Sequence, residues 1–226
     1  AAYRVVLAFT GVAGLLGNAV FPRLSRLTHT LDTNENRLGE IMSLGARLLI
    51  YLALPIALTG SVFSHQLIPV LYGPDYAQSA NVLSILIWQV FTVFANVAFA
   101  FNLLAAHQDK PYFYSVSAGA VVNLALNLLL IPRFGMMSAA VATVVAEVVV
   151  LVMLYRYAYR LVAPVPMIVP LLKAVFAAAM FLLAVYLVQN TILQFVLSNL
   201  AYVAALAITR PFSLDEYRFM LPWRTE

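Results

Sequence analysis

The chain has 226 residues, of which 64% are hydrophobic and only 10% charged, and its mean hydropathy is +0.93. Soluble domains contain about 45–50% apolar and about 25% charged residues, so this composition excludes a water-soluble globular protein. The net charge of +4 comes from basic residues between apolar runs, a pattern typical of membrane orientation and not of nucleic-acid binding. The chain has no cysteine, and its three histidines lack the spacing of metal ligands, so we expect no metal, no cofactor and no nucleic-acid partner.

Seven apolar runs are long enough, or nearly so, to cross a membrane, which takes about 20 residues as a helix. A spanning segment has to satisfy its own backbone hydrogen bonds, and prolines and glycines separate the runs. The predicted helices lie at residues 3–21, 41–64, 79–105, 112–131, 135–157, 168–188 and 192–209. We therefore predict an all-α, polytopic integral membrane bundle over residues 1–210, followed by a cytoplasmic tail at residues 211–226 that lies in the membrane interface. Asp75 and Gln78 predict a capping box for the third helix.

Basic residues are strongly biased to one side of the predicted membrane. Eleven of the 13 Lys and Arg residues fall on one side, and only Arg4 and Arg133 fall on the other. The side rich in Lys and Arg is expected to be cytoplasmic, which predicts an outside N-terminus and a cytoplasmic C-terminus. The chain opens inside an apolar segment without the charged region of a signal peptide. Together with the odd number of helices, this indicates part of a longer protein.

Polar and small residues recur within the predicted spans at helical spacing, so each set forms a stripe along one helix face. The stripes are Arg4, Gly11 and Asn18; Gln89, Thr92 and Asn96; Ser115, Gly119, Asn123 and Asn127; and Gly135, Ala139, Thr143 and Glu147. Polar groups are costly in hydrocarbon, so we expect these stripes to turn away from lipid. A substrate path and hydrogen bonds between packed helices both remain open as explanations for the Asn and Gln residues.

Three of the charged residues inside the predicted spans are candidates for a function. Glu147 is about 18 Å from the start of its helix, close to the middle of the membrane. An ionised carboxylate at that depth needs a partner or water, so Glu147 is a candidate for coupling or gating, with a buried structural bond as the alternative. Arg4 and Arg47 are candidate intramembrane cations, although long basic side chains also extend to the interface.

The order of three motifs carries a family resemblance. FPRLSRL, LYGPDYAQSANVLSIL and NLALNLLLIPRFGMMSAAVATVVAE resemble segments of the polysaccharide transporter family, within the multidrug/oligosaccharidyl-lipid/polysaccharide flippase superfamily. The resemblance runs along essentially the whole chain and is strongest over residues 102–147. It implies a MATE-like fold of two six-helix lobes facing a cavity, with two further helices. This chain would be the C-terminal lobe, with the eighth to fourteenth helices.

The same resemblance implies a function. The protein would be a flippase, not an enzyme, that moves an undecaprenyl-pyrophosphate-linked oligosaccharide across the bacterial inner membrane by alternating access, for O-antigen or exopolysaccharide synthesis. Its implied partners are the polyprenyl-pyrophosphate-linked glycan, membrane lipids, a missing N-terminal lobe and a polysaccharide polymerase. Arginine pairs well with pyrophosphate, and amides suit sugar hydroxyls. The candidate substrate-binding residues are therefore Arg4, Arg47, Gln89, Asn96, Asn123 and Asn127.

Three other classes of protein are alternatives to a flippase. A cation-coupled multidrug exporter of the same superfamily is disfavoured because Glu147 is the only acid near mid-membrane. A seven-helix receptor fits the predicted topology, but the chain lacks a disulfide pair and a lysine in the last helix. A membrane-bound glycosyl- or acyltransferase would need a catalytic set at membrane depth, and the chain has neither that nor a Walker loop for ATP hydrolysis.

Overall fold

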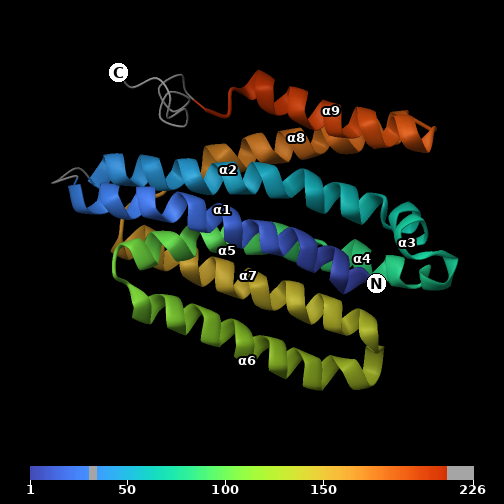
Figure 1. Ribbon diagram of the computed structural model, residues 1–226, viewed down its shortest axis with the longest axis horizontal. Coiled ribbons are helices and arrows are strands. Elements are labelled where there is room, and N and C mark those ends of the chain that lie inside the picture. Colours follow the sequence, from blue (N-terminus) through green and yellow to red (C-terminus); the bar gives the residue numbers. More distant parts are fainter. Residues whose placement is uncertain (31–34, 213–226) are drawn as a thin grey trace. The chain divides into compact units, whose positions relative to one another are not determined.

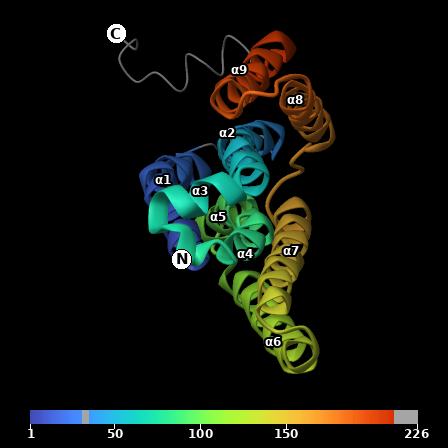
Figure 2. The same cartoon turned by 90° about the vertical axis from the view of Figure 1, so that its right-hand side faces the viewer.

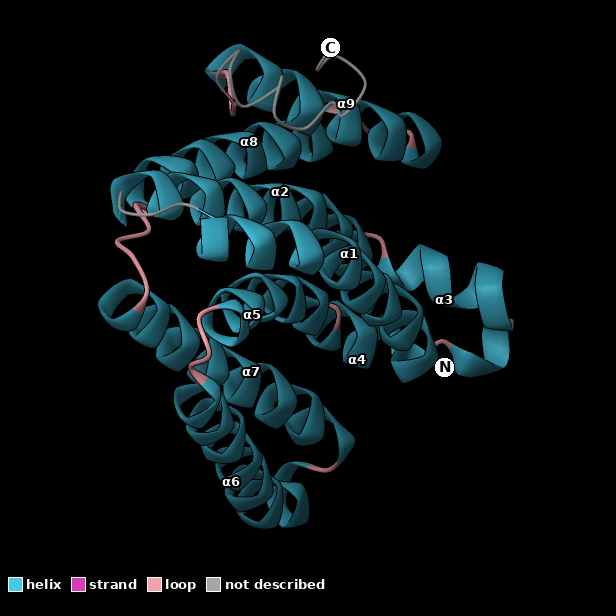
Figure 3. Ribbon diagram, turned by 60° about the vertical axis from the view of Figure 1, so that its left-hand side comes forward, coloured by secondary structure: helices cyan, strands magenta, loops and turns pink. Residues whose placement is uncertain are grey.

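The computed structural model describes the backbone of residues 1–30 and 35–212, and the side chains of residues 1–17, 39 and 42–212. Within these residues the helices are joined by loops and turns and there is no strand, which confirms the predicted all-α class (Figures 1 and 3). The helices are α1 (Ala2–Thr30), α2 (Glu35–Val62), α3 (Ser64–Tyr72), the 3-10 turn η1 (Pro74–Tyr76), α4 (Ser79–Leu86), α5 (Trp88–Ala105), α6 (Asp109–Phe134), α7 (Met136–Leu161), α8 (Ile168–Leu187) and α9 (Thr191–Thr209).

Six segments of the described chain are long and apolar enough to cross a membrane. They are Met42–Val62, Ser79–Ala105, Asp109–Phe134, Met136–Leu161, Ile168–Leu187 and Thr191–Thr209. The first helix adds a shorter apolar stretch, Ala2–Gly17. All seven predicted spans therefore correspond to helices, and the chain is a multi-pass membrane protein. The predicted tail at 211–226 lies almost wholly outside the described residues.

Several predicted helix ends are wrong, and α6 shows why. The predicted span 112–131 lies between Pro111 and Pro132, but both prolines lie inside the helix. Pro111 occupies the first turn, where its missing N–H has no intrahelical partner in any case. The chain turns instead at Gly135, whose φ of 64° and ψ of −149° suit a residue without a side chain. The prediction failed because a proline in the first turn of a helix does not break it.

The segment before the third predicted span also differs from expectation. Asp75 falls in the 3-10 turn η1, and Gln78 makes no capping hydrogen bond with its side chain at the start of α4. The predicted capping box is therefore wrong. The span itself is divided at Ile87 into α4 and α5, and the short helix α3 before it was not predicted.

The described chain divides into two compact units, residues 1–165 and 166–226. In the first unit α5 is central and packs against α1, α2 and α7. Its core brings together Val6 of α1, Ile68 of α3 and Leu83 of α4 with Val90 and Phe94 of α5. The hairpin partner of α7 is α6, which lies at the edge of this unit and contacts α5 only lightly (Figures 1 and 2).

The second unit is an antiparallel hairpin of α8 and α9. Ala177 and Phe181 of α8 and Tyr202 of α9 are buried in it. The hairpin turn ends at Asn190, whose Oδ1 accepts hydrogen bonds from the backbone N–H groups of Ile192 at 3.1 Å and Leu193 at 3.2 Å. These bonds satisfy donors that the first turn of α9 would otherwise leave unpaired.

Candidate functional site

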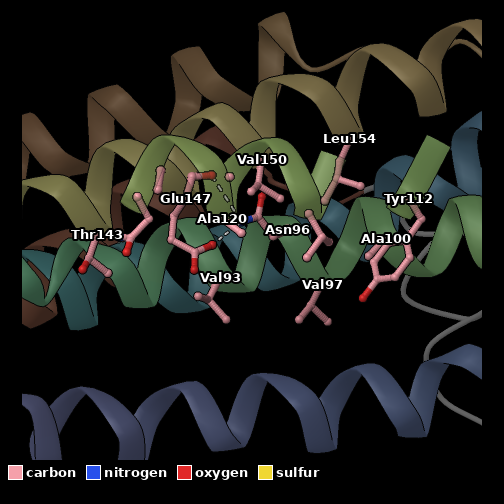
Figure 4. A pocket seen from close by; sticks show the side chains of 14 residues that line it. Val93, Asn96, Val97, Ala100, Tyr112, Ala120, Thr143, Glu147, Val150 and Leu154 are labelled. Atoms are coloured by element: carbon pink, nitrogen blue, oxygen red, sulfur yellow. Dashed lines mark hydrogen bonds between the residues drawn. The ribbon is translucent and has the colours of Figure 1, made fainter. Parts of the chain in front are cut away.

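The three helices α5, α6 and α7 line an open cavity of about 450 Å³. Asn96, Val97 and Ala100 line it from α5, and α7 contributes residues from Thr143 to Leu154. The third wall comes from α6, with Tyr112 at one end and Asn123 towards the other. Among the described residues that line the cavity, Glu147 is the one charged side chain (Figure 4). The volume of the cavity is within the range of about 300–1,000 Å³ that small-molecule sites occupy.

Asn96 and Glu147 form the polar centre of this cavity. Nδ2 of Asn96 donates to Oε2 of Glu147 at 2.7 Å and to the main-chain oxygen of Glu147 at 3.3 Å, as the dashed lines in Figure 4 mark. The amide of Gln89 lies beside the same carboxyl group. Asn96 is buried and Glu147 is half-buried. The carboxylate is therefore held between amides, with no cationic partner among the described lining residues.

The other polar side chains of this region bond within their own helices. Nδ2 of Asn127 donates to Oδ1 of Asn123 at 2.9 Å along α6. Oγ1 of Thr143 donates to the carbonyl of Ala139 at 2.9 Å along α7. Three buried amide oxygens are left without a partner, on Gln89, Asn96 and Asn127. All three oxygens are buried, so a ligand in the cavity has no direct access to them in this arrangement.

Helix α6 packs closely on α7 beside the cavity. Gly119 faces α7 so closely that a Cβ at this position would collide with the side chain of Val150. Both residues line the cavity. A small residue at this crossing lets the two backbones approach, which is the usual way that helices pack within a membrane.

The structure separates the seven candidate residues into two groups. Asn96, Asn123 and Glu147 line the cavity, and Gln89 and Asn127 lie beside these residues through the contacts above. The two arginines do not line it. Arg4 is exposed on α1, and Arg47 on α2 folds back onto Ser43, donating from Nε to the carbonyl at 3.2 Å and from Nη2 to Oγ at 3.3 Å.

Sequence reasoning missed two features of this site. It assigned Asn96 to sugar contacts and did not pair it with Glu147, because no sequence signal places α5 next to α7. It also missed Tyr112, which closes one end of the cavity (Figure 4). The predicted stripe of Arg4, Gly11 and Asn18 is described only in part, since the side chain of Asn18 lies outside the described residues. In the described part of the chain, no His, Asp and Glu residues gather in a group that could hold a metal ion.

An all-helical, multi-pass bundle whose polar residues gather in a cavity at membrane depth defines a membrane transporter lobe. The family model of the lipid II flippase MurJ matches residues 5–206. The chain therefore belongs to the MurJ lipid II flippase family, which is a family of transporters and not of enzymes.

Curated relatives agree with this assignment. The chain is 26% identical over 146 residues to a probable low-salt glycan biosynthesis flippase, Agl15, of Haloferax volcanii, which covers 63% of this chain and 30% of the relative. It is 26% identical over 141 residues to a putative O-antigen transporter of Shigella flexneri, covering 62% of this chain and 32% of the relative. The chain is also 26% identical over 132 residues to a probable multidrug resistance protein of Bacillus subtilis, YoeA. The match covers 55% of this chain and 28% of the relative.

A solved structure of the lipid II flippase MurJ in an inward closed conformation has the same fold, with a TM-score of 0.76 at 16% identity. The match covers 97% of this chain and 46% of that chain, so this chain spans less than half the length of the solved protein. The resemblance to lipid-linked glycan flippases, which the order of motifs indicated, is confirmed. The matching model is that of the lipid II flippases within the superfamily.

Proposed function

We propose that the whole protein moves a polyprenyl-pyrophosphate-linked glycan, with undecaprenyl as the lipid, across the bacterial cytoplasmic membrane by alternating access, for surface polysaccharide synthesis. The observation that carries this proposal is the family match over residues 5–206. The names of two relatives, a glycan biosynthesis flippase and an O-antigen transporter, favour a glycan as the cargo. In this proposal a further lobe completes the path, and a polysaccharide polymerase uses the product.

The charge of the cavity limits which part of this cargo it can contact. A pyrophosphate next to Glu147 would place like charges together in a medium of low dielectric, which is strongly unfavourable. Sugar hydroxyls, in contrast, are neutral and can donate hydrogen bonds to carboxylate and amide oxygens. We therefore assign the pyrophosphate to Arg4, which is exposed on α1, and hydroxyl contacts to the amides of α5 and α6.

Complementation of a flippase-null strain tests the proposal. The full-length gene should restore surface polysaccharide, measured at matched membrane protein levels. Loss of lipid-linked glycan that had accumulated on the cytoplasmic side should accompany this recovery. A strain that makes the protein in its membrane and still lacks surface polysaccharide would refute the proposed activity for that glycan, and a panel of strains with different glycans extends the test.

A cation-coupled multidrug exporter is the second candidate. It is favoured by the name of the Bacillus subtilis relative and by the half-buried carboxylate of Glu147 in the cavity. In that case the full-length gene should raise resistance to cationic drugs in a pump-deficient strain, Glu147→Gln should abolish the resistance, and surface polysaccharide should stay absent. The two strains therefore separate the two functions.

A further inference from the structure

The membrane span Ser79–Ala105 is divided at Ile87, although nothing in the local sequence interrupts a helix there. The residues around the break, SILIWQV at positions 84–90, include neither proline nor glycine. Sharp bends in helices arise at proline, at glycine, at a π-bulge, or where a side chain enters the ladder of backbone hydrogen bonds. The cause of this break therefore lies in a neighbouring helix.

The backbone hydrogen bonds show where the ladder of this span fails. The N–H of Ile87 donates to the carbonyl of Leu83 at 2.9 Å, four residues back, but the N–H of Val90 donates to the carbonyl of Ile87 at 3.0 Å, three residues back. In a regular α-helix the N–H of Trp88 would donate to the carbonyl of Ser84. The described chain does not form that bond. The Ser84 oxygen would therefore be unpaired inside an apolar span, which is costly in lipid.

Ser61 of α2 provides the missing donor. Its Oγ donates to the carbonyl of Ser84 at 2.8 Å, from 23 residues earlier in the chain. Helix α2 comes close to the break at Gly60, where a Cβ would collide with the side chain of Ile87. The Ser61 hydroxyl therefore takes the place that the N–H of Trp88 has in an unbroken helix.

The break comes directly before the polar residues of α5. Gln89 follows Ile87 by two residues, and its amide lies beside the carboxyl group of Glu147, to which Asn96 donates at 2.7 Å. We propose that Ser61 is a positioning residue: its hydrogen bond holds the bend between α4 and α5, and this bend sets the angle at which α5 presents Gln89 and Asn96 to Glu147. Without the hydroxyl, the two backbone groups at the break pair with each other and the span straightens. The role of this bend in transport rests on the proposed function.

Hydrogen–deuterium exchange of the full-length protein in lipid nanodiscs, resolved to single amides, tests the bend. In Ser61→Ala the N–H of Trp88 gains an acceptor, so its exchange should slow about fivefold, the effect of about one hydrogen bond. A variant that only lost stability would exchange faster there, so the direction of the change separates the two roles. Ser61→Thr keeps the hydroxyl and should exchange like the wild type. Ser84→Ala is the matched control, because Ser61 binds the main-chain oxygen of Ser84, whereas the Ser84 hydroxyl bonds to Asn81 in its own helix.

Unchanged or faster exchange at Trp88 in Ser61→Ala would overturn the assignment of the bend to Ser61. Transport is scored separately in the flippase-null strain. Ser61→Ala should lower surface polysaccharide at matched membrane protein levels, and Ser61→Thr and Ser84→Ala should keep it. Slower exchange together with polysaccharide at the wild-type level would overturn the positioning role. A wild-type gene that restores no polysaccharide would overturn the proposed function alone, because the exchange result still decides the bend.

Discussion

Asn96 and Glu147 lie 51 residues apart in the chain, yet one amide group of Asn96 binds Glu147 twice, at Oε2 and at the main-chain oxygen. The 2.7 Å bond to Oε2 is short, as expected for a carboxylate acceptor. The two bonds tie α5 to α7. This pair is therefore both a structural tie between two helices and the polar centre of the cavity.

A double-mutant cycle measures the strength of this tie. We expect Asn96→Ala and Glu147→Ala each to lower the free energy of unfolding, with a coupling energy of about 1.5–3 kcal/mol, because the hydrogen bond involves a charged group. Asn96→Asp should be more destabilising than Asn96→Ala, since it places two carboxyl groups together. Unfolding is followed in detergent or bicelles. Asn199→Ala in the other unit serves as the control and should be additive with Glu147→Ala; a coupling near zero for the Asn96 pair would contradict the assigned bonds.

The helical fold was predictable because membrane spans depend on run length and composition alone. Helix ends were less predictable, since they depend on local geometry that composition does not encode. Pro111 does not interrupt α6 because it falls in the first turn of the helix. The chain turns at Gly135, whose φ of 64° suits a residue without a side chain. The sequence could not show whether Pro132 or Gly135 would end this helix.

The site was predictable only one helix at a time. A spacing of four residues places Asn123 and Asn127 on one face of α6, and the structure joins them by a hydrogen bond. The same reasoning assigned Asn96 to a polar face of its helix. It could not show that this face meets Glu147, because periodicity fixes the orientation of a side chain about its own helix and says nothing of which helix lies opposite. Contacts between helices distant in the chain require a structure.

Packing at Gly119 gives a second prediction. We expect Gly119→Ala to destabilise the protein by about 1–3 kcal/mol, because the added methyl group collides with Val150 of α7. In the double variant with Val150→Ala, the collision is removed and much of the stability should return. Gly14→Ala on α1 is the control, since nothing lies within 4 Å of a Cβ at that position. Thermal unfolding of the four proteins checks this, and equal losses with and without Val150→Ala would refute the close crossing of α6 and α7.

Membrane orientation is a third prediction, based on the bias of basic residues. The chain contains no native cysteine, so single cysteines can be placed in it cleanly. Cysteines at Asp75 and Asn190 should react with an impermeant maleimide from outside the cell, and those at Asp109 and Ser213 only after the membrane is opened. Labelling with the opposite pattern would invert the topology. It would also move Arg4 to the cytoplasmic end of its helix.

Arg4 is the subject of the last prediction, which concerns the pyrophosphate. Its side chain is exposed on α1, and Gly11, two turns further along the same predicted stripe, has nothing within 4 Å of an added Cβ. There is therefore room for a ligand beside this face of the helix. A guanidinium keeps its charge when it is desolvated and binds phosphate oxygens in pairs, whereas lysine offers a point charge.

In the full-length protein, Arg4→Ala and Arg4→Glu should abolish the recovery of surface polysaccharide in a flippase-null strain while the protein still inserts. Arg4→Lys should keep partial activity. Arg133→Ala is the matched control, because Arg133 is an exposed arginine assigned to the same side of the membrane, outside the candidate site. Polysaccharide at the wild-type level from Arg4→Glu would show that Arg4 only extends to the membrane interface. The pyrophosphate would then be bound by another cation, and Arg47, already in contact with Ser43, is the next to substitute.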